Sequence, residues 1–145
     1  MNRRELVTFA ADFADDAQWD QKGNLLIPGG RAIAETIREK LQERGVYSSD
    51  VYQHSYYGWA FDAISENFKL WILIAAAKEG WLLQLVQQES LIARLFGSSN
   101  TAGFDGLQTK VHDILTGDTR FSNVLWYTKA DYESGKKERA RPSPR

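Results

Sequence analysis

Two histidines, His54 and His112, are the side chains of this cysteine-free chain best suited to acid–base chemistry near neutral pH. No serine or carboxylate stands at a spacing that would pair with either one, and neither belongs to an HExxH or CxxC metal-binding pattern. We therefore predict no catalytic centre, no metal site and no cofactor. His54 is expected to make a structural hydrogen bond at a strand edge, and His112 to lie on the surface of a helix.

A second group with chemical potential is the set of four aspartates at positions 12, 15, 16 and 20. A calcium loop of the EF-hand type needs alternating oxygen ligands, then a glycine, and then a glutamate that closes the loop. Gly23 arrives too late for this pattern and no glutamate follows at the required place. The pattern therefore favours a solvated acidic loop, which a partner with a basic surface could use.

The segment Pro28-Gly29-Gly30 precedes a helical pattern and could expose backbone N–H groups to an anion. Neither a Gly-Lys-Ser/Thr phosphate loop nor a GxGxxG dinucleotide turn is present. We interpret the two glycines as a tight passage from a loop into the helix.

The segment of the chain with the most aromatic residues contains the candidates for an exposed binding surface. Six aromatic residues fall within fifteen positions, namely Tyr47, Tyr52, Tyr56, Tyr57, Trp59 and Phe61. Trp59 and Phe61 are expected in the core, which leaves Tyr47, Tyr52 and Tyr56 for the exposed side. Tyrosine is common in interface hot spots because it buries much area with few torsions to freeze.

Two helices should position these residues. Apolar residues recur every fourth position from Arg31 to Arg44, and Gly45 stands where a left-handed C-terminal cap belongs. A second helix is expected from Asp105 to about Gly117, with Asp105 and Gln108 forming a capping box. A short apolar helical turn is expected between Ser90 and Gly97.

Strands are expected over residues 57–63, 68–76, 81–87 and 122–128, with residues 46–54 as an edge strand. The short gaps between them favour antiparallel pairing. Near the N-terminus Val7-Thr8-Phe9 favours a strand, although the apolar spacing also fits a helix. The predicted fold is α+β, a two-layer sandwich of order β-α-β-β-β-β-α-β, with both helices on one face of a mostly antiparallel sheet. The residues expected to share one core are Ile33, Ile37, Leu41, Ile72, Leu83, Val111 and Leu115.

Length and charge agree with one domain. The 145 residues carry a net charge of −1, and the last ten hold five basic residues against one acidic residue and no large apolar group. We predict a single domain over residues 1–135 and a disordered basic tail over 136–145. The longest apolar run, residues 70–77, is too short to span a bilayer as a helix, and no signal peptide is recognised, so a cytoplasmic location is expected.

Three pieces of the chain carry a family resemblance: Leu41 to Gly45, Tyr57-Gly58-Trp59, and Val111 to Trp126. Over residues 28–128 the chain resembles small bacterial α+β proteins in which a helix ending in Leu-x-x-x-Gly precedes a Tyr-Gly-Trp strand. Several of these look like immunity or inhibitor partners of toxins. The resemblance implies a non-enzymatic protein, and it carries over no functional residue.

The functional hypothesis is a non-enzymatic protein-binding module, such as a toxin-immunity or inhibitor protein, that occludes a basic surface of its partner. Under this hypothesis the residues expected to bind the partner are Tyr47, Tyr52, His54, Tyr56, Asp15 and Asp16. One alternative is a small-molecule-binding or hydrolytic enzyme with a pocket near His54 and Tyr56, and another is a homo-oligomer that pairs through the open sheet face. We expect no nucleic-acid partner, because the aromatic segment lacks interleaved lysine and arginine, and no membrane partner.

Overall fold

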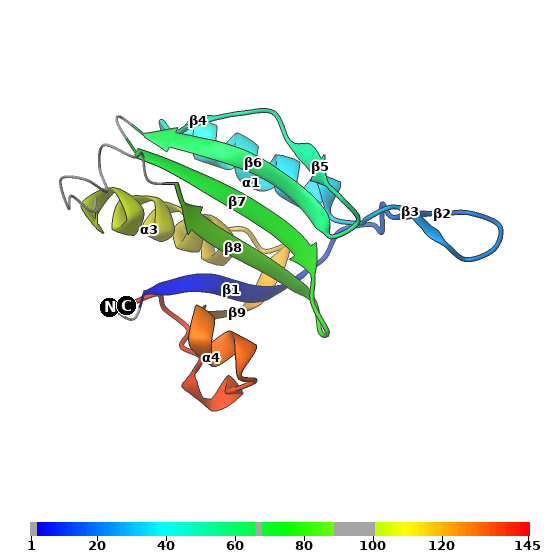
Figure 1. The fold of residues 1–145 in the computed structure, drawn as a ribbon. Helices are drawn as coiled ribbons and strands as arrows, with labels where there is room; N and C mark the ends of the chain where they lie inside the picture. The colour runs from blue at the N-terminus through cyan, green and yellow to red at the C-terminus, as the bar shows by residue number, and fades with distance from the viewer. Residues whose placement is uncertain (1–2, 66–67, 89–100) are drawn as a thin grey trace.

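The computed structural model describes residues 3–65, 68–88 and 101–145. It shows an α+β fold in which a seven-stranded sheet carries two long helices on one face, α1 (Arg31–Glu43) and α3 (Thr101–Gly117) (Figure 1). The opposite face of the sheet is uncovered over much of its area, and we call it the open face. The predicted two-layer α+β arrangement is confirmed.

The sheet is antiparallel throughout its described pairings, in the order β4-β6-β7-β8-β1-β9, with β5 also paired to β6. Its strands are β1 (Arg4–Ala11), β4 (Tyr47–Ser48), β5 (Tyr52–His54), β6 (Gly58–Ser65), β7 (Phe68–Ala76), β8 (Trp81–Gln87) and β9 (Phe121–Thr128). The N-terminal segment is therefore a strand, as Val7-Thr8-Phe9 indicated. The predicted edge strand over 46–54 is instead two short strands. Between them the ladder with β6 is interrupted at Ser49, because the N–H of Asp62 donates to the Ser49 hydroxyl and the Ser49 carbonyl accepts the guanidinium of Arg38.

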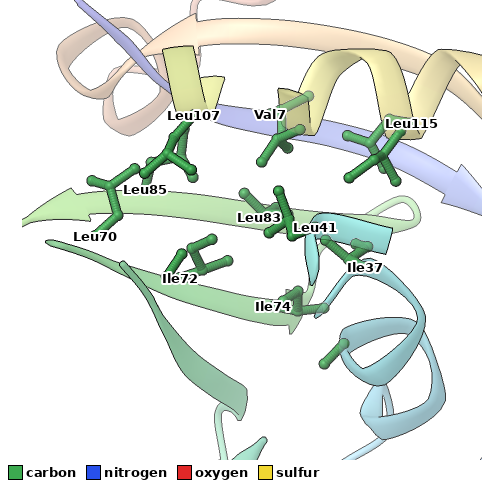
Figure 2. Packing of buried hydrophobic residues seen from close by; sticks show 14 of the residues in the cluster. Val7, Ile37, Leu41, Leu70, Ile72, Ile74, Leu83, Leu85, Leu107 and Leu115 are labelled. Atoms are coloured by element: carbon green, nitrogen blue, oxygen red, sulfur yellow. The ribbon is translucent and has the colours of Figure 1, made fainter. Parts of the chain in front are cut away.

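The core lies between the helices and the sheet. Alternate residues of the central strand β7, such as Ile72, are fully buried against the helices, whereas their neighbours face the other way. Figure 2 shows Leu41 of α1 beside Leu83 of β8, and Leu115 of α3 pointing into the same layer. All seven residues that were expected to share one core belong to the same buried cluster.

Helix α1 ends as its sequence predicts. Gly45 adopts a left-handed φ of +82°, which a residue without a side chain tolerates best. The N–H of Val46 then donates to the carbonyl of Leu41 at 3.0 Å, and the N–H of Gly45 donates to that of Gln42 at 3.0 Å. This is the Schellman pattern, and it brings the buried side chains of Val46 and Leu41 to the same end of the core.

The start of α3 differs from the prediction. The helix begins at Thr101, so Asp105 lies inside it and does not cap it. Gln108 is buried and donates its side-chain amide to the carbonyl of Arg4 at 2.5 Å, which ties the helix to β1. The expected capping box is therefore wrong, and the expected turn between Ser90 and Gly97 lies outside the described residues.

Two further elements have no counterpart in the predicted order. A hairpin of β2 (Gln18–Trp19) and β3 (Leu25–Ile27) projects from the end of β1 (Figure 1). After β9 come the short helix α4 (Lys129–Glu133) and a single 3₁₀ turn, η1 (Lys137–Arg139).

The C-terminal ten residues, which were predicted to be a disordered tail, lie against the rest of the protein in this structure. Arg141 exchanges two backbone hydrogen bonds with Trp126 of β9, at 2.7 and 3.0 Å, and Pro144 is buried. Arg145 reaches α3, where its guanidinium contacts Gln108 and Thr109 and lies 3.7 Å from the carboxylate of Asp105. The prediction counted apolar side chains only, whereas the segment is held by the unpaired edge of β9 and by polar contacts.

Candidate functional site

The described residues include seven large apolar side chains that are exposed: Trp19, Leu26, Tyr47, Tyr52, Tyr56, Tyr57 and Leu125. Three of these, Tyr52, Tyr56 and Tyr57, lie on β5 and the β5–β6 turn, and two, Trp19 and Leu26, lie on the β2–β3 hairpin, which projects from the same end of the sheet (Figure 1). We call this group, Trp19, Leu26, Tyr52, Tyr56 and Tyr57, the aromatic end. Clustered exposure of this kind is unusual on a protein surface that has no partner.

A tight turn between β5 and β6 pushes two tyrosines outward. Ser55 has a left-handed φ of +51°, and the N–H of Tyr57 donates to the carbonyl of His54 at 3.2 Å. The side-chain amide of Gln53 closes the turn by donating to the carbonyl of Ser55 at 2.8 Å. Tyr56 and Tyr57 are consequently 64% and 73% exposed.

A cluster of rings on the open face supports this turn. The imidazole of His54 packs edge-on against the indole of Trp71, with 5.0 Å between ring centroids, and lies 6.2 Å from Tyr57. The indole N–H of Trp71 donates to the hydroxyl of Tyr52 at 2.6 Å. His54 therefore acts through ring packing, and the described residues give its side chain none of the structural hydrogen bonds that were expected.

Tyr47 does not belong with the other predicted tyrosines. Tyr47 pairs with Ile64 at the far end of β6, whereas His54 pairs with Gly58 at its beginning. Six residues of extended strand separate these two positions, which corresponds to about 20 Å. The structure thus brings Tyr52, His54 and Tyr56 together and leaves Tyr47 apart.

The hairpin presents the remaining aromatic residue of this end. The carboxylate of Asp20 accepts the backbone N–H groups of Lys22 and Asn24, at 2.8 and 2.9 Å, and the side-chain amide of Asn24. The pKa of Asp20 is lowered chiefly by its hydrogen bonds with Asn24. This turn holds β2 and β3 together, and the pairing of the two strands fixes the backbone at Trp19 and Leu26.

Asp16 has a structural role that the sequence did not indicate. Its carboxylate accepts the backbone N–H of Gly30 at 2.8 Å and that of Ala32 at 2.9 Å, at the beginning of α1. The suggested anion site at Pro28-Gly29-Gly30 is thus filled by the chain's own carboxylate. Asp16 therefore has a role in the fold, and its assignment to partner binding stays a prediction.

Asp15 remains an exposed charge near this end. Among the described residues its carboxylate accepts just the nearby N–H of Ala17, at 3.0 Å, and Asp12 on the same connection is also exposed. The indole N–H of buried Trp59 donates to the carbonyl of Pro28 at 2.9 Å, which fixes the return of the hairpin against the start of β6. The hairpin and the β5–β6 turn are thereby tied to the same end of the sheet.

The expected position of His112 also needs correction. Its Nδ1 accepts the indole N–H of the fully buried Trp126 at 3.0 Å. The histidine thus provides the hydrogen-bond acceptor that this buried N–H group needs. Residues 3–65, 68–88 and 101–145 contain no cluster of three or more acidic or histidine side chains that could hold a metal ion. Of three surface hollows formed by these residues, none is lined by His54 or Tyr56.

Comparisons of the chain with protein-family models, with curated proteins and with solved structures find no match. Among the described helices, none combines the length and the hydrophobicity needed to cross a membrane.

Proposed function

We propose that the chain is a non-enzymatic protein-binding module whose aromatic end covers a surface of its partner, as inhibitors and toxin-immunity proteins do. The observation that carries the proposal is that five of the seven exposed large apolar side chains lie on the β5–β6 segment and on the hairpin that projects from the same end of the sheet. Exposed tyrosine and tryptophan are the side chains from which interface hot spots are most often built.

The support beneath these side chains favours binding without much reorganisation. Tyr52 is held by the indole of Trp71, and the β5–β6 turn is closed by Gln53. The hairpin that carries Trp19 has its own turn bonds through Asp20. Because less conformational freedom remains to be lost, more of the gain from burying the rings appears as affinity.

Charge has a secondary role in this proposal. Asp12 and Asp15 are exposed on the connection that leads to the hairpin. Exposed carboxylates steer the encounter with a basic partner more than they hold the complex, and salt screens their effect. Asp15→Asn should therefore reduce the association rate at low salt and change the dissociation rate little.

The experiment that tests the proposal places a photo-crosslinking amino acid, p-benzoylphenylalanine, at position 56 in the full chain. A second variant carries it at position 47, which is a matched control because Tyr47 and Tyr56 are 66% and 64% exposed. After illumination in the native host, we expect position 56 to yield a discrete crosslinked product and position 47 to yield none. A product at position 47 alone, or at neither position, would contradict the proposal.

A further inference from the structure

A separate hollow of about 520 Å³ opens on the open face of the sheet over β1 and β9, and none of the residues of the aromatic end line it. Its floor consists of side chains from β1 and β9, including Thr8, Ala10 and Leu125. The β7–β8 turn closes one side, and α4 with η1 closes the other (Figure 1). The volume lies within the range of about 300–1,000 Å³ that is typical of small-molecule sites.

The floor and wall of the hollow are mainly apolar. Leu125 projects from β9 with 37% of its surface exposed, a large apolar side chain left in contact with water. Beside it, Tyr127 is 5% exposed and packs against Tyr132 of α4 in an edge-to-face arrangement, with 5.5 Å between ring centroids. An apolar ligand body placed here would remove Leu125 from water without disturbing the core.

The rim of the hollow is cationic. Lys78 and Lys137 line it together with a single carboxylate, that of Glu79. Lys137 lies 3.7 Å from Glu79, whereas Lys78 has no ion-pair partner in the described part of the chain. The ammonium of Lys78 is thus available to an anionic head group.

The outer wall is held weakly. The pair of Lys137 and Glu79 joins η1 to the β7–β8 turn, and its side chains are 75% and 81% exposed. Ion pairs this exposed contribute little to stability, so breaking this one pair to admit a ligand costs little. A hollow along α1 offers a useful contrast, because it is lined mostly by charged and polar side chains such as Arg38 and Glu39 and has little apolar surface.

From these observations we propose that the hollow between β1, β9 and the C-terminal segment binds a small amphipathic anion. The apolar body of the ligand would lie on Leu125 and Tyr127, and its carboxylate or sulfonate group would face Lys78. This site is independent of the aromatic end, so the failure of either proposal leaves the other standing.

The test uses 8-anilinonaphthalene-1-sulfonate, a fluorescent aromatic anion, titrated into the full chain. We expect saturable binding at one site, with displacement by decanoate and none by decyltrimethylammonium at equal concentration. Leu125→Gln should weaken binding about tenfold, because it removes the apolar floor. Lys78→Ala should weaken it about fivefold, because it removes an exposed charge.

Two matched controls come from the hairpin. Leu26→Gln changes an exposed leucine and Lys22→Ala changes a lysine, and neither residue lines the hollow. Both variants should bind the dye like the wild type. Amide NMR spectra of the wild type with decanoate provide a measurement that needs no variant, with shifts expected at residues 8–10, 78–80 and 123–127. Shifts confined to other residues, equal displacement by the cation, or a loss on Leu26→Gln matching that on Leu125→Gln would overturn the proposal.

Discussion

Replacing Asp16 by alanine should lower the free energy of unfolding by about 2 kcal/mol, a large effect for a residue on a surface loop. The carboxylate satisfies two N–H groups, those of Gly30 and Ala32, which the geometry of a helix start leaves without intrahelical partners. Loss of an N-terminal cap costs about 0.5–2 kcal/mol, and a charged cap that also faces the helix dipole lies at the upper end of that range. Asp16→Asn should lose about half as much, because the amide keeps one acceptor oxygen.

The assay is urea unfolding followed by tryptophan fluorescence. With a urea dependence of about 2 kcal/mol per molar, the expected loss shifts the midpoint of Asp16→Ala down by about 1 M. Asp15→Ala is the matched control, because Asp15 accepts a single hydrogen bond within its own loop, and its midpoint should move by less than about 0.3 M. Equal midpoints for the two alanine variants would show that the Asp16 contacts do not stabilise the beginning of α1.

Three other changes test the packing and the electrostatics. Leu41→Ala should cost about 2–5 kcal/mol by urea unfolding, because Leu41 is fully buried; a loss below 1 kcal/mol would contradict the core packing. Deletion of residues 136–145 should lower stability by about 1–3 kcal/mol, since it removes two backbone hydrogen bonds to β9, and an unchanged melting temperature would show that the segment contributes nothing. Hydrogen bonds from Arg120 lower the pKa of Asp118, so its contribution is complete above about pH 4 and declines as the pH falls towards the folded-state pKa. Melting temperatures between pH 2 and 6 should fall less steeply with acid in Asp118→Asn than in the wild type, and identical profiles would refute this role.

Local patterns in the sequence were sufficient to predict most of the fold. The period of Ile33, Ile37 and Leu41 with Gly45 behind it defines α1, and the short gaps between the central strands permit only antiparallel pairing. What local patterns could not reveal are contacts between distant residues. The cap on α1 comes from Asp16, fourteen residues before Gly30, and the order of the C-terminal segment depends on an edge that exists only after β9 has joined β1.

The candidate site, too, could be predicted from local sequence patterns only in part. The exposure of Tyr52 and Tyr56 followed from composition and strand alternation, and the structure places both at one end of the sheet. The register of β6 decides which aromatic residues are neighbours, and this register moves Tyr47 away and brings Trp71 in from β7. Trp19 was missed because its two-residue strand gives no periodic signal, although Asp20 and Gly23 in the following turn could have indicated a hairpin.

The most direct test of the proposed function compares the affinity of two alanine variants for the partner recovered by crosslinking. Tyr56→Ala and Tyr47→Ala remove the same side chain at nearly equal exposure, from opposite ends of β6. If the aromatic end is the binding surface, isothermal titration should show Kd rising about 30-fold for Tyr56→Ala, as expected for a hot spot of about 2 kcal/mol, and less than threefold for Tyr47→Ala. Equal losses, or a greater loss for Tyr47→Ala, would contradict the assignment of partner binding to the aromatic end.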